Sequence, residues 1–245
     1  MNGVPLSRRY RLQRAIKRLP GLIVYYPLNE IEGTITRNHA PATKGSNNGT
    51  ISGATIGQPG KVGKAYSFDG VNDIVNLTNG NSIKGLTAFT IGAIISVTDS
   101  ANPKQIYHEL VSDGVFSRLG FFLDASEKLN LSVRSGLAAS TNYLVASSSG
   151  LSAGYHFVSA RVDVVNNFMR IYDKGTEVGA NTSVSFGGSI NNNNPFLPPT
   201  LGARTSASTP TYTDFFNDKI QHLFITSSLI SVSQLQELAH IAGFI

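Results

Sequence analysis

Cysteine and tryptophan are both absent from the 245 residues of this chain. Without cysteine, neither a disulfide framework nor a thiolate zinc site can form. Long apolar runs are also missing, since none approaches the ~20 residues that span a bilayer. The apolar stretch behind the basic N-terminus is interrupted at Leu19-Pro20-Gly21, so the sequence predicts no membrane span and no signal peptide. We therefore expect synthesis in a cytoplasm without export.

Charged residues are scarce as well, at 14% of the chain, where about a quarter is typical. The composition is instead rich in Ser, Thr and Asn and includes 24 glycines. Gly and Asn tolerate the positive φ angles that tight turns need, so many short elements joined by turns are expected. Hydrophobic residues make up 41% of the chain, enough for a sizeable core, and all-β chains of this length commonly form one unit.

Positive charge is concentrated at the N-terminus. The first 24 residues contain six basic residues and no acidic one, which leaves 14 of the 20 basic residues against all 15 acidic ones in the remainder. The net charge of +5 therefore describes a basic segment on a nearly neutral body. The six basic residues are Arg8, Arg9, Arg11, Arg14, Lys17 and Arg18.

Residues 7–18 are predicted to form a short helix that carries this charge. Ser7 is a suitable N-cap, and Leu12, Ile16 and Leu19 recur at helical spacing on one face. A helix this short is marginal in water, so we expect its apolar stripe to lie on another surface.

From residue 22 onward the hydrophobic period changes to that of strands. More than ten short strands are predicted, with the clearest alternation at 89–97, and residues 50–56 are taken as one strand. Residues 205–213 are predicted to be a loop. A closing helix is predicted at 231–241, with Ser231 as its cap. This pattern is typical of a sandwich or jelly roll.

Several segments are similar to one known family. The most specific is GKAYSFDGVND at 63–73, and VYYPLNE at 24–30 matches an opening strand of the same family. Further matches follow in the expected order, at 47–54, 89–91, 155–163, 169–175, 201–202, 216–225 and 231–238. On these segments the chain resembles the LamG-like jelly rolls of the concanavalin A-like lectin/glucanase superfamily.

The resemblance implies an all-β fold, a two-sheet antiparallel jelly-roll sandwich with a short N-terminal helical arm and a C-terminal helix. We divide the chain into a basic arm at 1–21 and a jelly roll at 22–245. Two departures stand out: the family's tryptophans are replaced here by residues such as Tyr155, and Gln221 occupies the place of an acid. The second departure weakens any cation site implied by the family.

Catalysis is not expected. Glycoside hydrolysis on this fold requires two carboxylates facing a sugar cleft, and no glutamate in the chain begins the E-x-D strand pattern of the glucanase relatives. The five histidines show no metal-ligand spacing. No cofactor is predicted apart from calcium, for which Asp69, Asn72 and Asp73 are the candidate oxygen ligands. The alternative is that Asp69 only stabilises a tight turn through its own backbone, and that reading is favoured.

The sequence predicts a binding or structural role. An unexported jelly roll with a basic arm resembles bacteriophage virion proteins, such as head decoration proteins, fibres or tail proteins. The arm residues Arg8, Arg9, Arg11, Leu12, Arg14, Ile16, Lys17 and Arg18 would then bind a capsid or tail protein, and a homo-oligomer is a further option. Nucleic acid is disfavoured because Tyr10 is the only aromatic residue of the arm that could stack on bases.

The alternative is a lectin-like adhesion module that binds a host-surface glycan. Exposed aromatic side chains in loops would contact the sugar, and the candidates are Tyr143, Tyr212 and Phe215. The fold supports this alternative by analogy alone.

Overall fold

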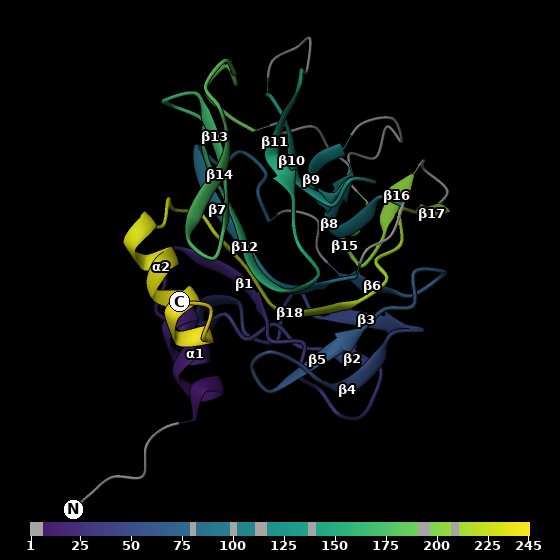
Figure 1. The fold of residues 1–245 in the computed structure, drawn as a ribbon. Helices are drawn as coiled ribbons and strands as arrows, with labels where there is room; N and C mark the ends of the chain where they lie inside the picture. The colour runs from purple at the N-terminus through teal and green to yellow at the C-terminus, as the bar shows by residue number, and fades with distance from the viewer. Residues whose placement is uncertain are drawn as a thin grey trace, which may run out of the picture.

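The computed structural model describes residues 7–78, 82–98, 102–110, 117–136, 141–190, 197–206 and 211–245. Most of these residues belong to two antiparallel sheets packed face to face, with two helices outside them (Figure 1). The predicted all-β, two-sheet antiparallel jelly roll with an N-terminal and a C-terminal helix is confirmed. Residues 1–6 of the predicted arm lie outside the described residues.

Sheet A is built around the long strand β7 (Ala88–Val97), whose neighbours are β12 and β18. Its strands are, in spatial order, β14 (Thr176–Asn181), β13 (Phe168–Asp173), β12 (Gly154–Asp163), β7, β18 (Lys219–Thr226), β5 (Lys64–Ser67) and β4 (Thr55–Pro59). The first strand, β1 (Leu22–Tyr26), also pairs with β18, beyond the point where β5 pairs with it.

Sheet B forms the other layer of the sandwich. Its strands are, in spatial order, β11 (Asn142–Gly150), β10 (Lys128–Arg134), β9 (Ser117–Leu123), β8 (Lys104–Leu110), β15 (Thr200–Leu201), β6 (Ile74–Leu77), β3 (Gly49–Ser52) and β2 (Ile35–Thr36). A single turn of 3-10 helix, η1 (Pro41–Thr43), lies between β2 and β3.

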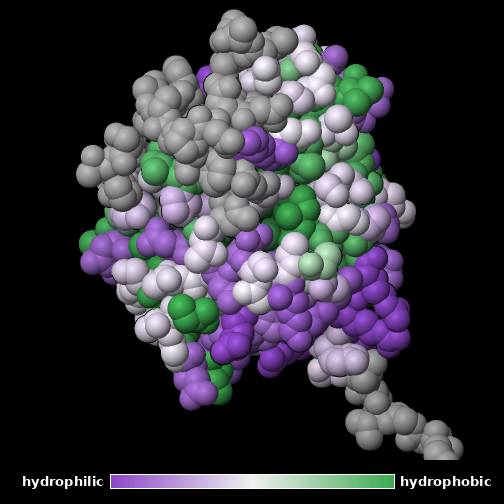
Figure 2. Space-filling view, turned by 180° about the vertical axis from the view of Figure 1, so that it is seen from behind, coloured by the Kyte–Doolittle hydropathy of each residue, from purple (hydrophilic) through white to green (hydrophobic). Residues whose placement is uncertain are grey.

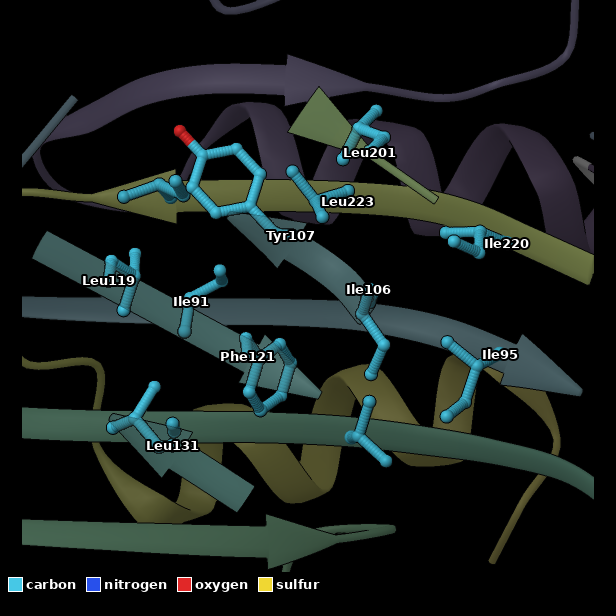
Figure 3. Close-up of a cluster of buried hydrophobic side chains, with 14 of the residues drawn as sticks. Ile91, Ile95, Ile106, Tyr107, Leu119, Phe121, Leu131, Leu201, Ile220 and Leu223 are labelled. Atoms are coloured by element: carbon cyan, nitrogen blue, oxygen red, sulfur yellow. The ribbon is translucent and has the colours of Figure 1, made fainter. Parts of the chain in front are cut away.

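The main core fills the space between the sheets. Strand side chains alternate between the two faces of a sheet, and the inward set here is aliphatic and aromatic. Ile91 and Ile95 of sheet A face Phe121 and Leu131 of sheet B, and all four are fully buried or nearly so (Figure 3). Burial of this apolar surface is the main force that holds the sheets together.

The predicted strand at 50–56 is divided into two, and the halves join different sheets. β3 belongs to sheet B and β4 to sheet A. The break occurs at Gly53, which has a φ of +83°. A Cβ there would lie 2.1 Å from Asp73 Oδ1, so only glycine fits this crossing.

Two further segments with polar sequences form strands. Within the predicted loop 205–213, β16 (Arg204–Ser206) and β17 (Thr211–Thr213) form a small hairpin, and residues 207–210 lie outside the described part. Likewise β11 continues to Gly150, because Lys128 of β10 still pairs with it after a bulge. In both segments, pairing with a neighbouring strand outweighs the low strand propensity of the polar residues.

The helices α1 (Arg8–Lys17) and α2 (Val232–Ala242) pack against each other on the outer face of sheet A. Leu12 and Ile16 of α1 are each 1% exposed. They enter a second core together with Leu235 and Leu238 of α2 and sheet residues such as Phe224. The apolar stripe that was predicted to contact a partner is therefore covered by the chain's own body. Within the described residues, no helix is long and apolar enough to cross a membrane.

Candidate functional site

A hollow of about 340 Å³ lies on the outer face of sheet B, on the side away from the helices. We call it the sheet B hollow. Its lining comes from four neighbouring strands and from residues that flank the β16–β17 hairpin. The lining residues are Pro103, Gln105, His108, Gly120, Phe122, Ser132, Asn142, Leu144, Arg204 and Asp214.

Strand alternation explains why this face is polar. In β9, Leu119 and Phe121 point into the main core, so Gly120 and Phe122 take the outer face. In β10, Leu131 faces the core and its neighbour Ser132 lines the hollow. The antiparallel register pairs Ser132 with Gly120, which brings the two strands' outward residues together.

Gly120 lies at the floor of the hollow, and its lack of a side chain gives the hollow its depth. A Cβ at this position would lie 2.7 Å from Ser132 Oγ and 3.7 Å from Gln105 Nε2. Any side chain at this position would therefore displace the Ser132 hydroxyl and reduce the hollow. Phe122 is half-buried and presents part of its ring beside this floor.

Gln105 and His108 supply buried polar groups from β8. A bulge between Gln105 and Tyr107 resets the alternation, so that Ile106 and Tyr107 both enter the core while Gln105 and His108 line the hollow. The Gln105 amide nitrogen donates to the carbonyl oxygens of Tyr107 at 2.6 Å and Phe121 at 3.1 Å. Its orientation is therefore set by the sheet itself.

His108 is held neutral. Burial lowers the pKa of its imidazole to about 3, and the nearby charge of Arg204 acts in the same direction. The Thr205 backbone N–H donates to His108 Nδ1 at 3.3 Å, so the ring proton resides on Nε2. This imidazole is a fixed hydrogen-bonding group in the hollow at neutral pH, with no net charge.

The hairpin side of the hollow is charged. Arg204 Nη1 lies 3.5 Å from Asp214 Oδ2, and the Asp214 carbonyl oxygen accepts from the Gln105 backbone N–H at 2.8 Å. Among the described lining residues, Asp214 is the one carboxylate. Glycoside hydrolysis requires two carboxylates facing the sugar.

The three aromatic residues predicted to contact a ligand lie outside this lining. The Tyr143 hydroxyl donates to Ser185 O at 2.8 Å, and its ring packs edge-on against Phe186. The Tyr212 hydroxyl donates to Asn76 Oδ1 at 3.0 Å, and Phe215 is half-buried between β17 and β18. The sequence-based prediction missed Phe122 because it considered aromatic residues in loops. Phe122 lies in strand β9, and only the structure shows which face of the sheet its side chain takes.

The carboxylates proposed as calcium ligands accept backbone hydrogen bonds within a turn. Asp69 Oδ1 accepts the backbone N–H groups of Val71 at 2.8 Å and Asn72 at 3.2 Å. These hydrogen bonds, of which the one from Val71 has the largest effect, hold the pKa of the Asp69 carboxyl below its usual range. Asp73 Oδ2 accepts the Asp69 backbone N–H at 2.8 Å. In the part of the chain that the structure describes, no three His, Asp or Glu side chains form a metal-binding group.

The predicted partner residues of the N-terminal helix divide into two groups. Leu12 and Ile16 are buried in the second core, so they are not accessible to a partner while α1 is docked. The six basic side chains are all exposed: Arg8, Arg9, Arg11, Arg14, Lys17 and Arg18. The difference arises because the stripe finds its apolar contacts within the same chain.

No protein-family model matches the sequence, and no curated protein sequence matches it. Solved structures do match in fold. The binding domain of botulinum neurotoxin DC in complex with SialylT aligns with a TM-score of 0.60 at 9% identity, over 91% of this chain and 52% of that one. A structure of botulinum neurotoxin type C, whose cell entry is described as dependent upon interaction with two ganglioside molecules, gives a TM-score of 0.63 at 11% identity, over 94% of this chain and 53% of that one.

A third match is the heptameric SAP-like pentraxin of Limulus polyphemus, with a TM-score of 0.53 at 15% identity over 71% of this chain and 80% of that one. The chain spans about half the length of the neurotoxin binding domains. At such identities the matches show the fold alone: the class is the concanavalin-like jelly roll. The neurotoxin structures with this fold are binding domains.

Proposed function

We propose that this chain is a non-catalytic glycan-binding jelly roll whose sugar site is the sheet B hollow. The observation that carries this proposal is a single hollow that combines a partly exposed aromatic ring with side chains able to donate and accept hydrogen bonds. Phe122 supplies the ring, and Gln105, Ser132 and Asn142 supply amide and hydroxyl groups.

Sugars match this chemistry. A pyranose ring has an apolar C–H face and a rim of hydroxyl groups, so it suits a site with one apolar wall and several fixed polar groups. Phe122 and Leu144, which is 49% exposed, form the apolar wall. His108 remains neutral, so it places no charge beside the ligand.

The comparisons support the scaffold for such a role. The neurotoxin structures of the same fold are described with SialylT and with ganglioside molecules. Fold does not determine function, and the argument for this chain therefore rests on its own hollow.

Glycan-array binding and calorimetry of Phe122→Ala test the proposal. Covering about 50 Å² of ring face contributes ~1.3 kcal/mol, so we expect about tenfold weaker binding. Tyr10→Ala is the matched control, because Tyr10 is 52% exposed on α1 and lies on the other side of the molecule. Equal effects of the two substitutions, or a blank array, would exclude the sheet B hollow as the sugar site.

Gly120→Val is a second, independent variant. Its side chain would displace the Ser132 hydroxyl and enter the floor of the hollow, so binding should be lost; thermal unfolding of the variant checks that the fold is kept. Arrays run with calcium and with EDTA also test whether glycan binding depends on a calcium ion, for which Asp69, Asn72 and Asp73 are the candidate ligands.

A bacteriophage virion role is our second candidate function. It is favoured by the six exposed basic side chains of α1 and its C-cap Arg18, which a capsid or tail protein could contact. Mass spectrometry of purified particles would test it: recovery in stoichiometric amounts supports the role, and absence from the particles rejects it.

A further inference from the structure

A second depression lies on the helix side of the molecule. Where α1 packs against α2, a groove of about 460 Å³ opens between them. We call it the helix groove. It is on the outer face of sheet A, whereas the sheet B hollow is on the outer face of sheet B.

One wall of the helix groove is formed by arginines. Arg11, Arg14 and Arg18 line it at spacings of three and four residues, which place them along one face of the helix within about 10 Å. All three are exposed, and none of them forms an ion pair with any described residue. Seen from behind, the molecule has a broad hydrophilic area at the lower right of the view (Figure 2).

The floor of the helix groove is apolar. Leu19 of the segment after α1 contributes to it together with Leu238 and Ile241 of α2. The opposite wall includes Glu237, an acidic side chain. The groove therefore presents a cationic wall, an apolar floor and one negative charge.

The arginines are held on a rigid support. Leu12 and Ile16 fix α1 to the second core, and the Ser7 side chain accepts the Tyr10 backbone N–H at 3.3 Å as an N-cap. A cationic row that is ordered before binding loses less conformational entropy when a partner arrives. A free arm would have to order itself first.

We infer that the helix groove binds an acidic, amphipathic segment of a partner protein. Carboxylates of the segment would pair with Arg11, Arg14 and Arg18 in bidentate fashion, and an apolar side chain would enter between them over Leu19 and Leu238. Glu237 in the other wall repels a continuous phosphate backbone. Tyr10 is the aromatic residue of α1, which disfavours stacking of single-stranded nucleic acid.

The site is independent of the proposed sugar site. The two depressions lie on opposite outer faces of the sandwich, so a protein partner and a glycan can be held at once. Loss of one activity should leave the other intact.

The test uses the full chain and an array of 15-residue acidic peptides, each paired with a scrambled version of equal charge. Fluorescence anisotropy then measures Kd for the retained peptides. The variant is Arg14→Glu with Arg18→Glu, and the matched control is Arg37→Glu with Lys44→Glu. Both control residues are exposed and lie outside the groove, and the change in net charge is the same.

We expect the amphipathic peptides to bind more tightly than their scrambled partners, with about tenfold or greater weakening in the groove variant and less than about twofold in the control. Equal weakening in both variants would show general electrostatic attraction and overturn the inference. So would an array without retained peptides, or groove-dependent binding of a 20-nucleotide DNA or of phosphatidylglycerol vesicles that exceeds peptide binding.

Discussion

His222 lies within β18 at a bulge and has a positive φ of +53°. It marks the point on this strand where β5 pairing ends and β1 pairing begins. The Tyr25 hydroxyl donates to its Nδ1 at 2.8 Å, and its Nε2 N–H donates to Val62 O at 3.3 Å. Both ring nitrogens therefore have a partner in the neutral imidazole, the form that burial favours.

The pH dependence of stability follows from this site. Burial lowers the pKa of His222 to about 4, with a smaller contribution from the charge of Arg9. In the unfolded chain the pKa is ~6.5. The stabilisation is therefore complete above pH 6.5, and it falls by ~1.4 kcal/mol per pH unit as the pH decreases towards 4.

We predict that His222→Gln reduces the loss of unfolding free energy between pH 7 and pH 5 by about 2 kcal/mol. Urea unfolding at the two pH values measures it, with His240→Gln as an exposed control. Glu109 acts with the opposite sign, because burial raises its pKa to about 7. Since Glu109 is present in every variant, it cancels in the comparison. An unchanged pH dependence in His222→Gln would contradict the prediction.

At the scale of elements, α1 owes its order to packing. Its ten residues form a helix too short to persist alone, and Leu12 and Ile16 supply the contacts with the second core. Leu12→Ala should lower the free energy of unfolding by about 2–4 kcal/mol. Lys17→Ala, on the exposed face, should change it by less than about 0.5 kcal/mol. Urea denaturation measures both, and similar values for the two would show that α1 is not part of the folded unit.

The two helices were predictable because their signals are local. Ser7 and Ser231 cap them as expected, and Ser231 forms a complete capping box with Gln234. The prediction of a single strand at 50–56 was wrong. The chain breaks at Gly53, where it passes close to Asp73, and these two residues are distant in sequence. The β16–β17 hairpin was missed for a related reason: its strands are polar and pair with each other in a separate two-stranded sheet that lies beside β8.

At the scale of the molecule, the two cores share sheet A. Ile91 and Ile95 of β7 face the main core, and Ile94 of the same strand faces the second core. One core cannot lose its packing without loosening the sheet that bounds the other. We expect a single unfolding transition, with helix and tyrosine signals changing together.

Removal of residues 1–21 tests this coupling. It withdraws Leu12, Ile16 and Leu19 from the second core, each contributing about 1.5–3 kcal/mol. The truncated chain should be less stable and should bind the dye ANS, because Leu235 and Leu238 lose their cover. A peptide of residues 1–21 added in trans should reverse part of both effects. Stability equal to that of the full chain would show that the segment is a separable arm.

The sequence alone determined the class of fold, the two helices and the place of the positive charge. These features depend on hydrophobic period, capping residues and composition, all of which are set by residues close together in the sequence. Only the tertiary structure decided which strands became neighbours, and so brought Phe122, Gln105 and Ser132 to one hollow. It also decided that Leu12 and Ile16 cover the chain's own sheet, because the choice between an internal and an external apolar surface depends on what the rest of the chain leaves uncovered.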